Sequence, residues 1–428
     1  MLDQIDSHCP TFDARTIHSE IENLGEVCKE AVQRELKGKY ISITTEHWTS
    51  NKTENYAVLS AHWIEGGKFK SCVLHFEHHR GRTRGEDIGR EFSQIFDNYD
   101  FDLSYIVSVT TDTTDNMNTF GCYLQSKGVI HLYCDQHNIH ICVKLAYKNE
   151  NIPYSENIMK SARSLIEHFS SSTQASDKLL AMQKKINPSE VPKKLIKDVT
   201  KIWWSTWRML KRLSEFFAPI DALIASDQVQ VRNLTAAQKV IVTEIEKVLL
   251  PMAESQHFLE GHKYATASLV PLFLCTIRNT LRETKELNEV YPSTRHIAKL
   301  LYGDFTTKRY GDRTQVFHDN VVIGANKRYI SLHKIILVTI RLDPRMKELR
   351  TLLNDNDRDA TFEYLLELMD DDLDKVSGID SGVESEINEV FIDKNKCLDD
   401  SGGFFSELSM SNDNQREILC ENNEICNA

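Results

Sequence analysis

The chain has 428 residues, with 63 acidic against 51 basic side chains and a formal net charge of −12. That balance excludes a uniformly basic, histone-like protein. Hydrophobic residues make up 41% of the chain and charged residues 27%, a composition typical of globular proteins rather than fibrous or wholly disordered ones. The length allows two or three domains.

The sequence shows no pattern for insertion into a membrane or for export. Its longest apolar runs, residues 269–277 and 335–340, are far shorter than the roughly 20 residues needed to cross a bilayer. The N-terminal sequence MLDQIDSHCP does not have the pattern of a signal peptide. Ten cysteines occur without a CxxC pair, which favours reduced thiols inside a cell. We therefore expect no membrane contact.

Charge divides the chain into two parts. From residue 354 to the end there are 21 acidic and 5 basic residues, a net charge of −16, which leaves +4 for the first 353. The acidic part is rich in Asp, Ser, Asn and Gly and poor in periodic apolar residues, so it cannot bury enough surface to offset the entropy of ordering. We predict an acidic, mostly disordered tail with one short helix at residues 361–369.

The first 150 residues predict a helix followed by an α/β layer. Apolar residues at helical spacing predict one or two helices over residues 10–37. Short β-branched and aromatic runs then predict three consecutive strands, and helical patterns alternate with two further strands beyond them. The expected strands are residues 40–45, 56–64, 69–76, 105–111 and 129–133, and the expected helices are residues 86–96, 116–125 and 137–147. This order predicts a mixed five-stranded sheet.

Beyond about residue 151 the strand signals stop and a helical block of about 200 residues follows. The expected helices are residues 159–169, 176–185, 192–217, 237–259, 265–287 and 293–302, before a turn at Asp343 and Pro344. We therefore expect N-terminal helices over residues 1–37, an α/β core over 38–150, an all-α domain over 151–353 and the acidic tail over 354–428.

Two carboxylates form the first candidate site. Asp112 ends a buried apolar strand, and the carboxyl ends of such strands open onto the ligand crevice of α/β folds. Glu46 closes the first strand. If these strands are neighbours, the two acids lie side by side and would repel each other unless a cation such as Mg²⁺ neutralises them. Asp115, at the next helix start, is better explained as an N-cap.

A basic and aromatic segment forms the second candidate site. Residues 184–212 hold nine Lys or Arg against two acids, together with three tryptophans. Cations neutralise phosphates and an exposed indole can stack on a base, so the segment fits a nucleic-acid surface. The alternative is an amphipathic helix with tryptophans in the core and a solvated basic face. The candidate DNA-binding residues are Trp203, Trp204, Lys193, Lys194, Lys197, Lys201, Arg208, Lys211 and Arg212.

A third cluster, CDQHNIHIC, places Cys134, His137, His140 and Cys142 close together. Its spacing does not match the usual zinc modules, in which two short-spaced pairs are separated by a longer loop. A helix start whose polar residues face a groove explains it better than a structural zinc ion.

Five short blocks in a fixed order give the chain a resemblance to a known family. ISITTEHWTS, TTDTTDNM, CDQHNIHICV, WWSTWRMLKRL and RLDPRMKEL resemble the blocks of the hAT superfamily of DNA transposases and of the zinc finger BED domain-containing proteins derived from them. The resemblance covers about residues 10–350. It implies a ribonuclease H-like core interrupted by a long helical insertion.

Carried over by position, the family's functional positions fall on five residues of this sequence. The family's first catalytic aspartate falls on Glu46, a departure whose longer side chain disturbs an octahedral Mg²⁺ shell. The second aspartate falls on Asp112. The family's short cysteine and histidine motif falls on Cys134 and His137, which implies that His137 lies near the scissile phosphate. The tryptophan that the family places beside a flipped base falls on Trp203, and the usual preceding arginine is Ile202 here.

The resemblance also implies features that the sequence does not show. We find no match to the family's third acid, to its C-terminal dimerisation region or to its BED finger. We therefore expect a transposase-derived nuclear protein that binds DNA, has lost strand transfer, and pairs with itself or with related transposase-derived proteins. The alternatives are an active nuclease or transposase dependent on Mg²⁺ or Mn²⁺, its third acid supplied by Glu389 or Glu407, and a non-catalytic protein-interaction scaffold.

Overall fold

The computed structural model describes residues 13–50, 54–79, 84–148, 153–199, 203–261, 263–310, 317–318 and 332–343. The predicted acidic tail, with its expected helix and with Glu389 and Glu407, lies outside these residues. Contacts divide the chain into two compact units. The larger unit holds the sheet and most of the helices, and the smaller one holds residues 267–275 and the last described elements.

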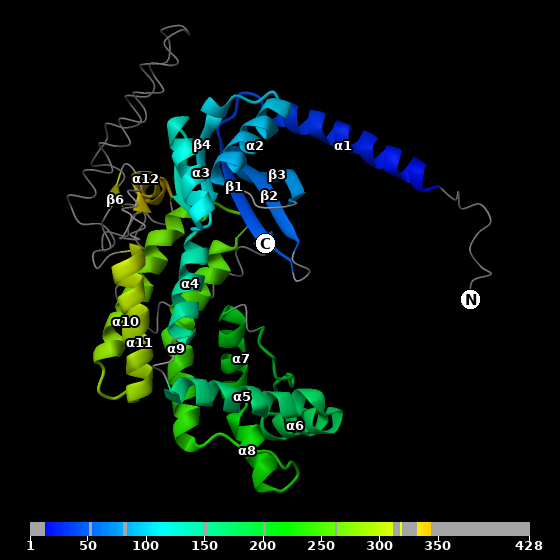
Figure 1. Ribbon diagram of the computed structural model, residues 1–428. Helices are drawn as coiled ribbons and strands as arrows, with labels where there is room; N and C mark the ends of the chain where they lie inside the picture. The colour runs from blue at the N-terminus through cyan, green and yellow to red at the C-terminus, as the bar shows by residue number, and fades with distance from the viewer. Residues whose placement is uncertain are drawn as a thin grey trace, which may run out of the picture. The chain divides into compact units, whose positions relative to one another are not determined.

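A mixed five-stranded sheet forms the centre of the α/β part, as predicted (Figure 1). The strands lie in the order β3-β2-β1-β4-β5; β1 to β3 form an antiparallel meander, and β4 pairs parallel with both β1 and β5. The elements are α1 (Ala14–Leu36), β1 (Ile41–Thr49), β2 (Asn55–Glu65), β3 (Lys68–His79), α2 (Gly85–Asn98), η1 (Leu103–Tyr105), β4 (Ile106–Thr111), α3 (Asp115–Ser126), β5 (Ile130–Tyr133) and α4 (Asp135–Lys148).

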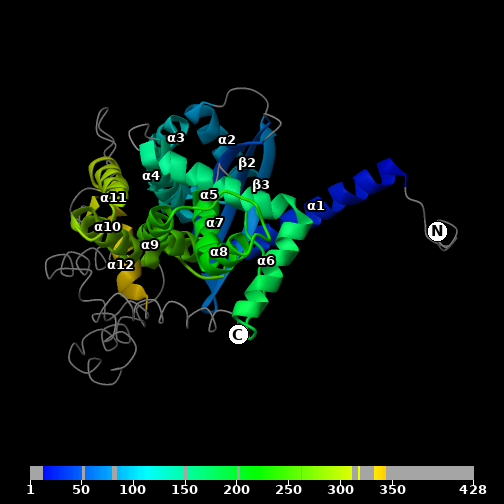
Figure 2. The ribbon, with the colours of Figure 1, turned by 90° about the horizontal axis from the view of Figure 1, so that it is seen from below.

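One face of the sheet packs against α2 and α3 through a hydrophobic core (Figure 2). Alternate strand residues such as Ile43 and Leu59 point to this face, while Phe92, Phe96 and Phe120 fill the space from the helices. Burying each such side chain contributes about 1.5–3 kcal/mol. The period-two pattern of the strands and the helical pattern of α2 and α3 therefore meet in one core.

The N-terminal helix α1 forms as predicted, in a single piece. Asp13 caps it by accepting a 2.7 Å hydrogen bond from the backbone N–H of Thr16. Only its C-terminal end joins the core, where Leu36 is buried. The apolar side chains of Ile21 and Leu24 are more than half exposed, so α1 leaves most of its apolar stripe uncovered.

The helical block follows, and α4 runs beside α9 and α11 in both Figures 1 and 2. Its helices are α5 (Pro153–Ser171), α6 (Thr173–Ile186), α7 (Trp203–Glu215), α8 (Phe217–Ala225), α9 (Ala236–Leu259), α10 (Val270–Glu286) and α11 (Pro292–Asp304), and α11 continues into a π-helix, η3 (Phe305–Tyr310). No helix of the described residues is long and apolar enough to span a membrane.

The prediction of one helix over residues 192–217 was wrong. Residues 191–199 have no regular structure, and α7 begins only at Trp203. Hydrogen bonds to side chains keep this segment in a non-helical conformation. The side-chain amide of Gln183 forms 2.9 Å hydrogen bonds with both the N–H and the carbonyl of Lys193. The Asp198 carboxylate accepts hydrogen bonds from Arg163 and Thr206. These bonds replace the helical ladder that the apolar spacing predicted.

The smaller unit contains strands that the sequence did not indicate. Two-residue strands β6 (Phe317–His318) and β7 (Leu332–His333) pair in parallel, next to α12 (Lys334–Leu342) and the short helix η2 (Ala267–Leu269). The Ser268 hydroxyl donates a 2.5 Å hydrogen bond to the Asp343 carboxylate. Two-residue strands are too short to leave a period in the sequence.

Candidate functional site

The register of the sheet places Glu46 and Asp112 next to each other. β1 and β4 run parallel, with Thr44 opposite Thr110, so continuing the register by two residues sets Glu46 opposite Asp112. Glu46 lies on the sheet face away from the phenylalanine core, the face on which Ser108 donates a 3.1 Å hydrogen bond to Ser42, and Asp112 directly follows the last residue of β4. The neighbouring strands that the carboxylate argument required are present.

Asp112 is held by the turn that leads into α3. Its Oδ1 accepts hydrogen bonds from the Thr114 backbone N–H at 2.9 Å and from the Thr114 hydroxyl at 2.7 Å. The prediction of Asp115 as the N-cap was wrong: Thr114 is the N-cap, with extended backbone dihedrals, and Asp115 is the first helical residue. At that position the Asp115 carboxylate is still stabilised by the positive end of the helix dipole.

The start of α4 lies at the end of β5, beside these acids. The Cys134 N–H donates a 2.7 Å hydrogen bond to the carbonyl oxygen of Thr111, and the Cys134 carbonyl accepts from Asn138. Burial raises the pKa of the Cys134 thiol to about 11, partly offset by the backbone N–H groups of His137 and Gln136. Without a bound metal the thiol therefore stays protonated near pH 7, which makes it a poor nucleophile.

His137 lies within electrostatic reach of both carboxylates. Burial is the main cause that lowers its pKa; Arg309 adds to this effect, while Asp112 and Glu46 oppose it. The imidazole is therefore neutral near pH 7, and its ring stacks on that of His140 with centroids 6.4 Å apart. The structure thus brings the three predicted catalytic residues, Glu46, Asp112 and His137, to the same end of the sheet.

The alternative of a zinc ion at CDQHNIHIC receives no support from the geometry. Cys142 is fully buried, and its thiol donates to the Leu301 carbonyl at 3.7 Å. Burial raises the pKa of this thiol far above its usual range. In the part of the chain that the structure describes, these four residues are not among the side chains whose ligand atoms converge within 4.8 Å.

A buried polar network behind His137 was missed by the sequence reasoning. The Tyr310 hydroxyl donates a 2.9 Å hydrogen bond to Asp135, and Arg309 donates at 2.7 Å to Asp304 and at 3.4 Å to Asn138. Burial raises the pKa of the enclosed Asp135 carboxyl to about 7. The network fixes α4 against η3, which lies more than 150 residues away in the sequence, so no local pattern could have indicated it.

The described residues do not assemble a complete two-metal site. Mg²⁺ takes oxygen ligands in a near-octahedral shell, and two-ion phosphoryl transfer needs acids that hold both ions. Glu46 and Asp112 supply two carboxylates, but no third acid or histidine of the described part joins them within 4.8 Å. Oδ1 of Asp112 is already bonded twice to Thr114. We therefore derive no metal-dependent step from these residues.

The basic segment is anchored by its backbone and exposes its lysines. Arg212 donates a 2.9 Å hydrogen bond to the Lys194 carbonyl, and Gln183 holds the backbone of Lys193. Both lysine side chains are exposed. Lys197 forms an ion pair with Glu167 at 2.7 Å, so part of its charge is already neutralised. Lys201 lies outside the described residues.

The three tryptophans of α7 differ in exposure. Trp203 is only 4% exposed, and its indole N–H has no hydrogen-bond partner among the described residues. Trp204 and Trp207 are half-buried, and each supports a cation: Arg208 lies 5.3 Å from the Trp204 ring and Lys211 lies 5.0 Å from the Trp207 ring. As it lies, Trp203 cannot stack on a base, whereas Arg208 and Lys211 are exposed.

Comparison with known proteins connects this geometry to a family. Residues 44–128 match the ZBED1 RNase-like domain, and residues 137–248 match the ZBED1 RNase-like helical domain. The first range contains most of the sheet with α2 and α3, and the second contains most of α4 and the helices up to α9. The chain is related to the transposase-derived proteins of the hAT and BED type. The resemblance predicted from the five blocks is confirmed.

A curated human protein gives the same result. The chain is 23% identical over 278 residues to zinc finger BED domain-containing protein 4 of Homo sapiens, an alignment that covers 61% of this chain. It covers only 22% of the human protein. The fold of an RNase-like domain with a helical domain is therefore shown for this chain, whereas the activity of the whole relative is not carried over. The predicted domain boundaries remain a prediction.

Proposed function

We propose that this chain is a transposase-derived nuclear protein that binds DNA through its basic segment and has no strand-transfer activity. One observation carries the proposal of binding: the backbone of residues 193–194 is tied to α6 and α7, which presents exposed cations from a rigid support. Cations held in fixed positions neutralise phosphates with less loss of side-chain freedom than cations on mobile loops. The nuclear location follows from the DNA partner.

The surface is suited to phosphates rather than to base edges. Lys193, Lys194, Arg208 and Lys211 are exposed, and two of these cations lie over tryptophan rings. Phosphate contacts fix position but carry no sequence information directly. The net charge of +4 over residues 1–353 is modest, so we expect no strong non-specific affinity. Because the contacts are to phosphates, we expect the binding to weaken as salt is added.

The binding proposal is tested by neutralising three exposed cations together, Lys193→Gln, Lys194→Gln and Lys211→Gln. For duplex DNA, log affinity falls against log salt with a slope of about −0.9 for each phosphate contact. The triple variant should therefore show a shallower dependence on salt, by up to about 3 units of slope. Fluorescence anisotropy over a salt series measures both slopes. The matched control neutralises exposed lysines elsewhere, Lys68, Lys127 and Lys299, and should keep the wild-type slope. Salt-independent binding, no binding, or an equal loss in the control would contradict the proposal.

The proposal that strand transfer is lost rests on the acids. Glu46 replaces the expected aspartate, and the described residues bring no third acid to Asp112. We expect no cleavage of DNA that carries transposon-like ends in Mn²⁺, the more permissive ion, for wild type and for Asp112→Asn alike. Gel analysis of end-labelled DNA checks this. Cleavage by the wild type that disappears in Asp112→Asn would establish the enzyme alternative and overturn this part of the proposal.

A further inference from the structure

Three ligand-type side chains converge between β3 and α2, away from the site described above. His75 Nε2 lies 3.1 Å from Oε2 of Glu77 and 3.6 Å from Oε1 of Glu91. One ligand atom from each residue lies within 4.8 Å of the other two. His75 and Glu77 point toward α2, on the opposite face of the sheet from Glu46, so the cluster is independent of the Glu46 and Asp112 end.

A β-bulge produces this convergence. Leu59 pairs with His75 and Ser60 pairs with Val73, so Leu74 is the extra residue in β3. The bulge places both Leu74 and His75 on the helix-facing side, and Glu77, two residues further on, shares that side. Without the extra residue His75 would face the other side of the sheet. A bulge that re-aims a side chain is a common feature of functional sites.

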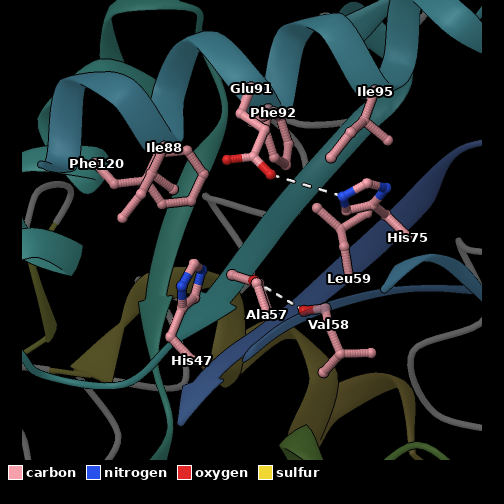
Figure 3. A pocket seen from close by; sticks show the side chains of 11 residues that line it. His47, Ala57, Val58, Leu59, His75, Ile88, Glu91, Phe92, Ile95 and Phe120 are labelled. Carbon is pink, nitrogen blue, oxygen red and sulfur yellow. Dashed lines mark hydrogen bonds and ion pairs between the residues drawn. The ribbon is translucent and has the colours of Figure 1, made fainter. Parts of the chain in front are cut away.

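The cluster opens onto an apolar pocket (Figure 3). The apolar side chains that line the pocket include Leu59, Ile88, Phe92, Ile95 and Phe120, and its polar lining groups are Thr45, His47, His75 and Glu91. Figure 3 shows the Glu91 carboxylate reaching down from α2 toward the His75 ring, with the apolar side chains on both sides. The low-polarity walls strengthen a charge interaction made at their edge.

We propose that His75, Glu77 and Glu91 bind a divalent transition-metal ion of the Zn²⁺ type. Zn²⁺ binds imidazole nitrogen and carboxylate oxygen at about 2.0–2.2 Å, so tetrahedral geometry sets two ligand atoms roughly 3.3–3.5 Å apart. The observed separations of 3.1 and 3.6 Å lie on either side of that value. Three protein ligands leave a fourth position for water or a small ligand.

Charge also favours a divalent ion over a proton in this cluster. A protonated imidazole brings +1 against two carboxylates, whereas a neutral imidazole with Zn²⁺ brings +2 and cancels them. Bound metal would join β3 to α2 directly, and so would stabilise the RNase-like domain.

Glu91→Gln tests the site, because it removes a charged ligand and keeps the side-chain size. The full chain is stripped with a chelator under reducing conditions and titrated with Zn²⁺ by isothermal calorimetry. We expect one site in the wild type and affinity at least about tenfold weaker in Glu91→Gln, since the loss of even a supporting residue costs about 10–100-fold. Glu86→Gln, an exposed change on the same helix, is the matched control and should retain full affinity.

Two further measurements distinguish this site from zinc bound by cysteines. Co²⁺ at the site should show four-coordinate d–d bands that Glu91→Gln removes, without the charge-transfer band of thiolate ligands. Zn²⁺ should raise the thermal midpoint of the wild type and of Glu86→Gln but not of Glu91→Gln, with unchanged circular dichroism confirming that each variant folds. Equal Zn²⁺ affinity in wild type and Glu91→Gln, or only thiolate-type Co²⁺ spectra, would mean that the cluster is an ion pair, and the proposal would fail.

Discussion

Arg309→Met is expected to lower the free energy of unfolding by about 3–5 kcal/mol, the cost of removing one partner from a buried ion pair. The side chains of Arg309 and Asp304 are only 9% and 8% exposed, and their atoms Nε and Oδ2 lie 2.7 Å apart. Methionine fills the space of the arginine stem but removes the Arg309 cation from the buried Asp304 carboxylate. The variant also removes the bond from Arg309 to Asn138, which helps to fix α4 behind His137.

A second substitution identifies the cause of that loss. Adding Asp304→Asn to Arg309→Met removes the buried charge, so the double variant should be more stable than Arg309→Met alone, as urea unfolding followed by circular dichroism would measure. Arg90→Met breaks an exposed ion pair with Asp87 and should change stability little. If the single and double variants are equally unstable, lost packing rather than loss of the Arg309–Asp304 ion pair explains the effect.

The sheet could be predicted from the sequence because its strands carry the information themselves. β-Branched and aromatic residues with turn-forming stretches between them fixed the existence and order of β1 to β5. The placement of Glu46 beside Asp112 required only the assumption that β1 and β4 are neighbours, since strand ends in a parallel pair meet at one edge. The ends of the elements were less accurate: β1 continues to Thr49, beyond the predicted residue 45.

Features that depend on distant side chains could not be predicted. The ion pair of Arg309 and the bond from Tyr310 to Asp135 join α4 to a π-helix whose own sequence has no distinctive period. The open segment before α7 depends on Gln183 and Asp198, which compete with helix formation only once α5 and α6 are in place. The convergence of His75, Glu77 and Glu91 needs a bulge, which shifts the face of a strand without a marker in the sequence.

The buried position of Trp203 shows a related limit. Its place in a basic segment suggested contact with DNA, but its helical spacing also fits a core residue. In the structure Trp203 is buried at the start of α7, the helix that packs against α9. Composition cannot distinguish a tryptophan that supports a cation from one that fills the core. Trp204 and Trp207 show the first arrangement and Trp203 the second.

Gly121→Ala is expected to lower the free energy of unfolding by roughly 2 kcal/mol, although the same change normally favours a helix by about 1 kcal/mol. A Cβ atom at Gly121 would lie 2.1 Å from Nδ1 and 2.5 Å from Cε1 of His131. That imidazole is 3% exposed and packs edge-on against Tyr133, so it has little room to move. Overpacking of this kind forces side chains out of their preferred rotamers.

Hydrogen bonds connect the crowded His131 ring to the candidate site. The Thr111 hydroxyl donates a 2.7 Å bond to the carbonyl of Asp112, so at 2.8 Å it accepts from Nε2 of His131. Displacing the His131 ring therefore disturbs the end of β4, where Asp112 lies. Burial lowers the pKa of His131 to about 4, so the ring stays neutral and donates through this one N–H near pH 7.

Two controls make the Gly121 prediction specific to that contact. Gly25→Ala lies in α1 with nothing within 4 Å of the added methyl, so it should raise stability by up to about 1 kcal/mol through helix propensity alone. In a His131→Ala background the ring is absent, and Gly121→Ala should then become neutral or stabilising. Urea unfolding of the four chains of this cycle measures the coupling. A loss from Gly121→Ala that persists without the His131 ring would show that the helix backbone, and not the contact between α3 and β5, requires glycine at this position.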